Sequence, residues 1–177
     1  MNCIVYLGVW ADEGEQIVPS LRGEGATVIV VPALELAENV NRALPGMNGL
    51  IAVVNGVTLS EGWLRVAESE MGGHLVLSPW ISQEDGGSRA WWEPVYPNAF
   101  IVKSQPLDAI GGLDERLVFH HHRTLTQRFP KDLCTSTSSI TATPVINAQR
   151  EKVVGDLYYR HLEDDRVLRE ESGAILD

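Results

Sequence analysis

The chain has 177 residues, of which 44% are hydrophobic, enough for one buried core but not for two ordinary domains. Its 24 acidic and 14 basic side chains give a formal net charge of −10, which opposes nonspecific attraction to nucleic acid or anionic lipid. No apolar stretch approaches the roughly 20 residues of a membrane-spanning helix, so we expect a cytoplasmic protein without a membrane span. Cys3 and Cys134 lie far apart without paired spacing, which predicts buried thiols rather than a disulfide framework or a cysteine metal site.

The first half of the chain alternates apolar strands with helical patterns. Strands are predicted at residues 4–10, 26–31, 49–54 and 74–77, and helices at 15–21, 34–44 and 61–71. This alternation is typical of an α/β sheet whose strands are buried on both faces. We therefore expect one α/β domain with a mostly parallel central sheet flanked by helices.

The second half has a different character. A hairpin or long loop follows residue 78, a strand is predicted at 99–102, and Gly111-Gly112 ends a short helix. The polar segment 135–143 reads as a loop or an edge strand. Residues 151–171 are expected to form a C-terminal helix, with Leu157, Tyr158 and Leu162 on its apolar stripe and Asp164 facing water.

One stretch carries a family resemblance. The segment 98–103, NAFIVK, is followed by 107–116, LDAIGGLDER. Together they resemble family-2 glycosyltransferases, in which a strand of this kind precedes a short helix that ends in "iGGfDE". Upstream, residues 39–44, NVNRAL, look like that family's "aRNxGl" helix, and residues 49–64 look like its strand "yvlfLNpDt" followed by "epgwL".

The resemblance implies a compact GT-A fold that binds a nucleotide-diphospho-sugar over the carboxyl ends of the parallel strands, usually with Mn or Mg. Residues 1–77 would form the nucleotide-binding half and residues 78–130 the acceptor and active-site half. Asp12, Asn41 and Asn55 would then contact the donor, and Asp114 in the GGxDE element would contact the acceptor. The alternatives without a functional role are that Asp12 is a solvated loop residue and that Asp114 caps the next helix.

The sequence departs from the family at two places. Where the family has an aspartate in its metal and diphosphate motif, this chain reads Asn55-Gly56-Val57-Thr58, and a valine cannot ligate a hard cation. The second departure follows the GGxDE element, where no carboxylate lies between Glu115 and Asp132 to serve as the base. We therefore predict no metal ligands, and the usual route to Mn or Mg is in doubt.

The segment after the GGxDE element supplies other chemistry. His121 or His122 could act as the base that activates an acceptor hydroxyl, and Arg123 could offset the charge on the leaving phosphates without a metal. Adjacent helical side chains point about 100° apart, so the histidines cannot all face one site and could instead belong to a solvent-facing helix start. A zinc site would need further converging ligands, and no motif ties His74 or His161 to the run.

These observations predict a glycosyltransferase that moves a sugar from a nucleotide sugar to an unknown acceptor, with an altered centre. The alternative is a catalytically inactive binding protein of the same fold. A serine hydrolase is disfavoured, because the chain has no Gly-x-Ser-x-Gly turn after a strand.

Overall fold

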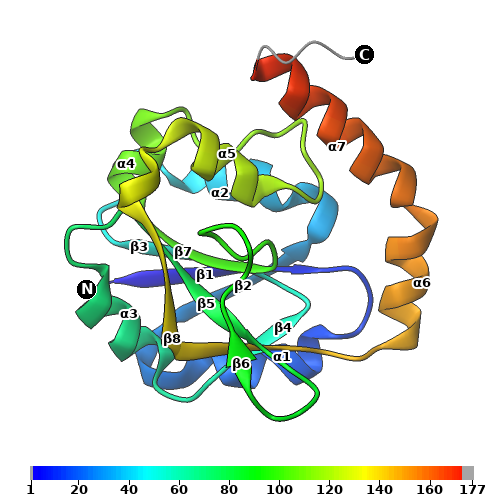
Figure 1. Cartoon of the computed structure of the whole chain (residues 1–177), viewed down its shortest axis with the longest axis horizontal. Helices are drawn as coiled ribbons and strands as arrows, with labels where there is room; N and C mark the ends of the chain where they lie inside the picture. The colour runs from blue at the N-terminus through cyan, green and yellow to red at the C-terminus, as the bar shows by residue number, and fades with distance from the viewer. Residues whose placement is uncertain (1, 173–177) are drawn as a thin grey trace.

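The computed structural model describes residues 2–172, apart from the side chain of Glu24, and contains a mixed sheet of eight strands between two layers of helices (Figure 1). The strands are β1 (Cys3–Val9), β2 (Thr27–Pro32), β3 (Leu50–Asn55), β4 (Val57–Leu59), β5 (Val76–Ser82), β6 (Ser88–Arg89), β7 (Ala99–Lys103) and β8 (Cys134–Pro144). The helices are α1 (Gly14–Arg22), α2 (Leu36–Ala43), α3 (Trp63–Met71), α4 (Ser104–Ala109), α5 (His121–Arg128), α6 (Ala148–Asp156) and α7 (Tyr158–Glu171). Short 3-10 turns occupy Gly23–Gly25, Ala33–Glu35 and Lys131–Leu133. No helix within residues 2–172 is both long and apolar enough to span a bilayer.

The first three long strands are parallel, as the alternation predicted. β1 pairs with β2 on one side and with β3 on the other, both in parallel register. The apolar runs of β1 and β3 are buried because helices cover both faces of the sheet, whereas β2 is an edge strand whose side chains are mostly exposed, so the expectation of burial on both faces is wrong for β2. The α/β class is therefore confirmed.

The prediction of a mostly parallel sheet is wrong. The strand order is β2-β1-β3-β7-β5-β8-β4, and β7 lies antiparallel to both of its neighbours, β3 and β5. The apolar run of β7 shows that the strand is buried on both faces, but not the direction in which it runs. That direction follows from the hairpin of β5 with β6 and from the loop that brings the chain back to Ala99.

The segment predicted as a loop or an edge strand is strand β8, which has β5 as its one partner among the described strands up to Thr141 and is joined by β4 only at Ala142–Pro144. It pairs with β5 in parallel register and with β4 in antiparallel register, with a register irregularity at Pro79/Trp80 on β5. Its seven Ser and Thr side chains, at 135–139, 141 and 143, made it look like a polar loop in the sequence, although threonine is β-branched and suits a strand. Ile140 and Ala142 are the positions that it buries completely.

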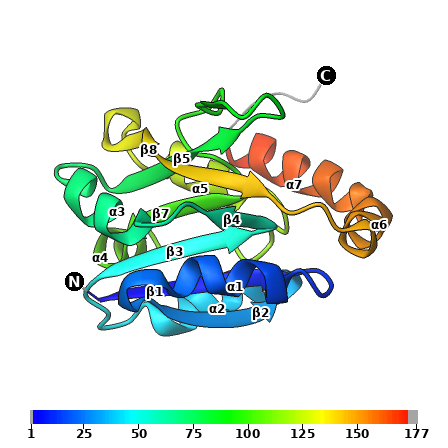
Figure 2. The same ribbon diagram turned by 90° about the horizontal axis from the view of Figure 1, so that it is seen from below.

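The two helical layers form separate apolar clusters. Helices α1 and α3 pack on one face, against strand residues such as Val5 and Ala52, whereas α2, α4 and α5 pack on the other, against Tyr6 and Phe100. Both cysteines are free and buried, as predicted. Figures 1 and 2 agree that α6 and α7 stand outside both layers, beyond the end of the sheet where β1 stops.

The C-terminal helix is not continuous, and its inner face is not the predicted one. α6 begins at Ala148, and the helical hydrogen bonding breaks at Leu157 before α7 starts. Tyr158 and Leu162 are exposed, while Asp164 is completely buried. The inner face of α7 is carried by Asp164, Val167 and Leu168, so the expected orientation of this helix was wrong.

The two glycines after α4 offer a matched test of the loop that follows. Gly111 and Gly112 have φ angles of +89° and +81°, but a Cβ at Gly111 would meet open space whereas one at Gly112 would collide with Asn41 Oδ1. We expect Gly111→Ala to cost about 1 kcal/mol from the backbone conformation alone. Gly112→Ala should cost about 3 kcal/mol, because it also displaces the Asn41 amide. Urea unfolding of both variants measures the difference, and equal costs would show that the Asn41 contact contributes nothing.

Candidate functional site

A cavity of about 220 Å³ lies where β1 and β3 end and β7 begins. This is the edge of the sheet at which open α/β folds place their ligands. The residues that line it come from both halves of the chain and from the C-terminal helices: Trp10, Leu36, Val53, Asn55, Pro97, Asn98, Phe100, Val118, Phe119, His121, Arg150, Val154 and His161. Of the described side chains, no carboxylate lines this cavity, and Arg150 is its one permanent charge. A cavity of this composition suits an anion.

Asn55 ties together the segments that form the floor of the cavity. Its Oδ1 accepts a hydrogen bond of 2.8 Å from the indole Nε1 of Trp10, and its backbone N–H donates to the carbonyl of Asn98 at 2.8 Å. The loop after β1 is fixed further by Glu13, whose buried carboxylate accepts from the backbone N–H groups of Trp10 and Ala11. The end of β3 and the loops beside it are therefore held rigidly.

An aromatic stack forms one wall of the cavity. The ring of Phe119 stacks on Trp10 with centroids 5.1 Å apart and on His161 with centroids 3.7 Å apart. Beyond the stack, His161 Nδ1 lies 3.4 Å from His120 Nε2. Burial lowers the pKa of both imidazoles, that of His120 to about 4, helped there by the charge of Arg123.

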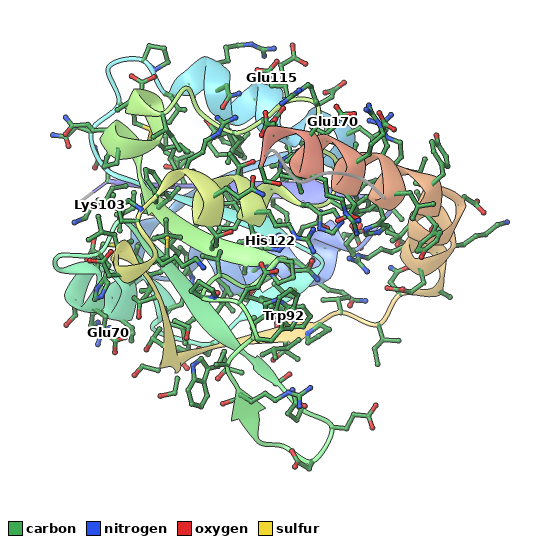
Figure 3. The ribbon with its side chains drawn as sticks, turned by 45° about the horizontal axis from the view of Figure 1, so that its top comes forward. Glu70, Trp92, Lys103, Glu115, His122 and Glu170 are labelled. Carbon is green, nitrogen blue, oxygen red and sulfur yellow. The ribbon has the colours of Figure 1, made fainter. Side chains whose placement is uncertain are left out.

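The histidine run divides at the start of α5, as the 100° spacing of helical side chains requires. His121 lines the cavity, whereas His122 is absent from its lining and places Nε2 3.3 Å from Glu93 Oε2. His122, labelled near the centre of the view in Figure 3, is 3% exposed. Both side chains are buried, so the alternative of a solvent-facing helix start is wrong. Burial lowers the pKa of His121 to about 4, so its imidazole is neutral near pH 7.

Glu93 is the carboxylate that lies beside His122 and Arg123, and no sequence motif pointed to it. Burial opposes its ionisation, but the hydrogen bond from His122 and the charge of Arg123 outweigh this and lower its pKa. Arg123 itself pairs with Asp165 at 2.9 Å and lies 3.8 Å from Glu93. It is not among the residues of the cavity, so the predicted role of Arg123 at the phosphates has no support from its position.

Asp164 on α7 positions the segment that carries these histidines. Its carboxylate accepts hydrogen bonds from the backbone N–H groups of Val118 at 2.8 Å, Phe119 at 2.7 Å and His120 at 3.1 Å. An anion suits this location, because it lies beside the amino end of α5. Through these bonds α7 anchors the segment just before α5, from which Phe119 and His121 line the cavity.

Asp114 lies outside the cavity. Arg116 donates to both of its carboxylate oxygens, from Nε at 3.0 Å and from Nη2 at 2.7 Å, and these bonds lower the pKa of Asp114. Arg116 also bonds Glu171 at the end of α7. Asp114 thus helps fasten the loop to the C-terminal helix, and its predicted contact with an acceptor remains a prediction.

Asn41 and Asp12, the other two residues predicted to contact the nucleotide-sugar donor, do not line this cavity either. Asn41 uses its amide to accept from the N–H of Leu113 and to donate to the carbonyl of Leu113, both at 2.8 Å. Asp12 lines a neighbouring open groove of about 530 Å³ formed by α1 and the ends of β1 and β2, and it accepts a 2.7 Å bond from Asn147. Of the predicted site residues, the structure brings Asn55 and His121 together.

Sequence reasoning missed Trp10, Asn98, Arg150 and His161 at the cavity. Trp10 and Asn98 stand at strand ends, a position that could have marked them. Arg150 and His161 had no such signal, because they enter from helices that pack against the sheet end only in the folded chain. Of the residues in the described part of the chain, no three His, Cys, Asp or Glu side chains converge to hold a metal ion.

Comparison with known proteins bears on the fold. No protein-family model and no curated protein matches the sequence. Among solved structures, the chain resembles protein A197 from STIV with a TM-score of 0.59 and 12% identity, over 83% of this chain and 87% of that one. It also resembles the mannosyltransferase PcManGT from Pyrobaculum calidifontis, whose structure holds GDP-Man and Mn²⁺, with a TM-score of 0.55 and 10% identity. This chain has a glycosyltransferase-like fold.

The second likeness covers 83% of this chain but 57% of the mannosyltransferase, so the chain spans little more than half of that enzyme's length. Identities of 10–12% establish a shared fold and do not establish a shared activity. The resemblance to family-2 glycosyltransferases is one of sequence motifs.

Proposed function

We propose that this chain binds a nucleotide-diphospho-sugar at the sheet-end cavity and transfers the sugar to a hydroxyl group of an acceptor. The observation that carries the proposal is the lining of the cavity, where Arg150 and the neutral imidazoles of His121 and His161 meet without any carboxylate among the described side chains. The glycosyltransferase-like fold supports it, because the similar mannosyltransferase binds GDP-Man.

The volumes of the cavity and of the groove beside it suggest which part of the nucleotide sugar each one binds. A cavity of about 220 Å³ is small for a complete nucleotide sugar, since pockets for such ligands usually measure at least about 300 Å³. We place the diphosphate and sugar there, beside Asn55, and the nucleoside in the groove beside Asp12. Asn147 joins the two sites, because it bonds Asp12 with its amide nitrogen and the backbone N–H of Arg150 with its amide oxygen. Residues 1–77 would then supply most nucleotide contacts, and residues 78–130 would face the acceptor.

His121 is the proposed base. The acceptor oxygen attacks the anomeric carbon, the bond from that carbon to the phosphate oxygen breaks with its electron pair leaving on the diphosphate, and the hydroxyl proton passes to the imidazole of His121. His121 lines the cavity, and its Nδ1 has no hydrogen-bond partner. The pKa of about 4 makes His121 a weak base in the free protein, but a bound diphosphate favours the imidazolium and raises this pKa.

The test is donor binding and turnover in matched histidine variants. Wild-type protein is titrated with uridine, guanosine, thymidine and cytidine diphosphate-sugars, and both the melting temperature and donor hydrolysis are followed. We expect one donor to be bound and turned over, His121→Gln to lower turnover about 100-fold with binding retained, and His122→Gln to change turnover less than about threefold. Loss of turnover in His122→Gln alone would contradict the assignment of the base, and the absence of binding by any donor would contradict the function.

A binding protein without transferase activity is the second candidate. Its support is the ion pair of Asp114 with Arg116, which engages the GGxDE carboxylate outside the cavity. In the same titration this candidate predicts donor stabilisation with no hydrolysis or transfer by wild-type protein.

A further inference from the structure

Arg150 occupies the space above the turn in which glycosyltransferases of the resembling family carry their metal motif. Gly56, between Asn55 and Val57, has φ +68°, and a Cβ there would lie 2.5 Å from Cζ and 2.7 Å from Nε of Arg150. Any other side chain at position 56 would therefore displace the guanidinium. The glycine and the arginine fit together although 94 residues separate them in the sequence.

The residues of this turn do not fit a divalent cation. Val57 is completely buried in β4, and Asn55 Oδ1 already accepts the indole N–H of Trp10. A hard cation needs several oxygen ligands, and no described carboxylate lines the cavity. A guanidinium over the same turn would also repel Mn²⁺ or Mg²⁺.

The Arg150 side chain is mostly buried, and its hydrogen-bonding capacity is not used up. Nη1 bonds Glu151 at 2.5 Å, but Glu151 is 61% exposed and does not line the cavity, so this pair is a weak one. The Nε N–H is buried and has no hydrogen-bond partner. An unpaired buried donor of a cationic group is costly, and a phosphate oxygen would satisfy it.

We infer that Arg150 binds the diphosphate of the nucleotide sugar over the Gly56 turn and takes the place of the divalent cation. This inference rests on the proposed function and deepens it. Arginine suits the role, since its planar fork donates to two phosphate oxygens at once. Arg150 lies in the first turn of α6, whose N-cap is Asn147. The partial positive charge at the amino end of this helix adds to the charge of the guanidinium. The donor site of this chain is therefore built to work without metal.

Binding of GDP, UDP and inorganic pyrophosphate to the full chain, with EDTA or with Mn²⁺, tests the inference by isothermal titration calorimetry. We expect the Kd in EDTA and in Mn²⁺ to agree within about threefold. Arg150→Met should weaken the binding of pyrophosphate and of the preferred nucleoside diphosphate about 10- to 100-fold, and Arg150→Lys less. The binding of the corresponding nucleoside, which lacks phosphates, should not change.

Arg166→Met is the matched control, because it removes one positive charge from an exposed arginine on α7 that pairs with Glu163 and Glu170. It should leave every affinity unchanged. Gly56→Ala should weaken diphosphate binding with the arginine still present, which guards against misfolding of the Arg150→Met protein. Diphosphate binding that needs Mn²⁺ and survives Arg150→Met would overturn the inference and leave the proposed function standing. No diphosphate binding under either condition would overturn both.

Discussion

Replacing Asp164 with alanine is expected to destabilise the protein by about 4 kcal/mol. The carboxylate is completely buried and accepts from three consecutive backbone N–H groups, those of Val118, Phe119 and His120. Alanine would leave these donors without partners beside the amino end of α5, and each unsatisfied donor costs about 1–3 kcal/mol. A change of this size is a large part of the total stability of a small domain. Urea unfolding followed by circular dichroism measures it.

Asp165→Ala is the matched control, because the neighbouring carboxylate is partly exposed and pairs with Arg123 and Arg169 near the surface. It should cost about 1 kcal/mol or less. Asp164→Asn keeps one acceptor oxygen and should fall between the two alanine variants. A cost for Asp164→Ala no larger than that of its neighbour would show that α7 does not anchor the segment before α5.

Acid is expected to destabilise the protein before its carboxylates are protonated. His121 has a pKa of about 4 in the folded chain because it is buried, against 6.5 for an ordinary histidine in the unfolded chain. Between these values the unfolded chain binds more protons, so the stability that is present above pH 6.5 is lost as the pH falls toward 4. For His121 alone the loss is about 2 kcal/mol between pH 7.5 and pH 5. His120 shifts in the same direction.

The His121→Gln variant tests this origin, since glutamine is polar and does not titrate. The groups that act on His121 are the carboxylates of Asp164 and Asp114, which raise its pKa, and the imidazoles of His120 and His122, which lower it. Unfolding free energies from urea titrations at pH 7.5, 6 and 5 should fall about 2 kcal/mol less in the variant than in wild-type protein. Parallel profiles for the two proteins would place the acid sensitivity elsewhere.

These expectations share one structural cause. The cavity is completed by a C-terminal segment that contacts it through Arg150, Val154 and His161, while Asp164 holds the chain that presents His121. The inner face of α7 includes His161, Asp164 and Leu168, spaced by three and four residues. The spacing of apolar residues predicts the wrong buried face for such a helix. Its buried face includes polar side chains whose hydrogen-bond partners lie in another part of the chain.

The sequence by itself determined the α/β class, the buried strands β1 and β3, and the turn at Gly111-Gly112, since these depend on local apolar runs and backbone conformation. The family resemblance put Asn55 among the candidate site residues, and the histidine run put His121 there beside His122; of these three, Asn55 and His121 line the cavity. The tertiary structure alone decided the antiparallel direction of β7, the pairing of β8 with both β5 and β4, and the meeting of Arg150 with Gly56. Strand direction and contacts across 94 residues depend on how the chain returns to the sheet, and no local pattern of side chains records that path.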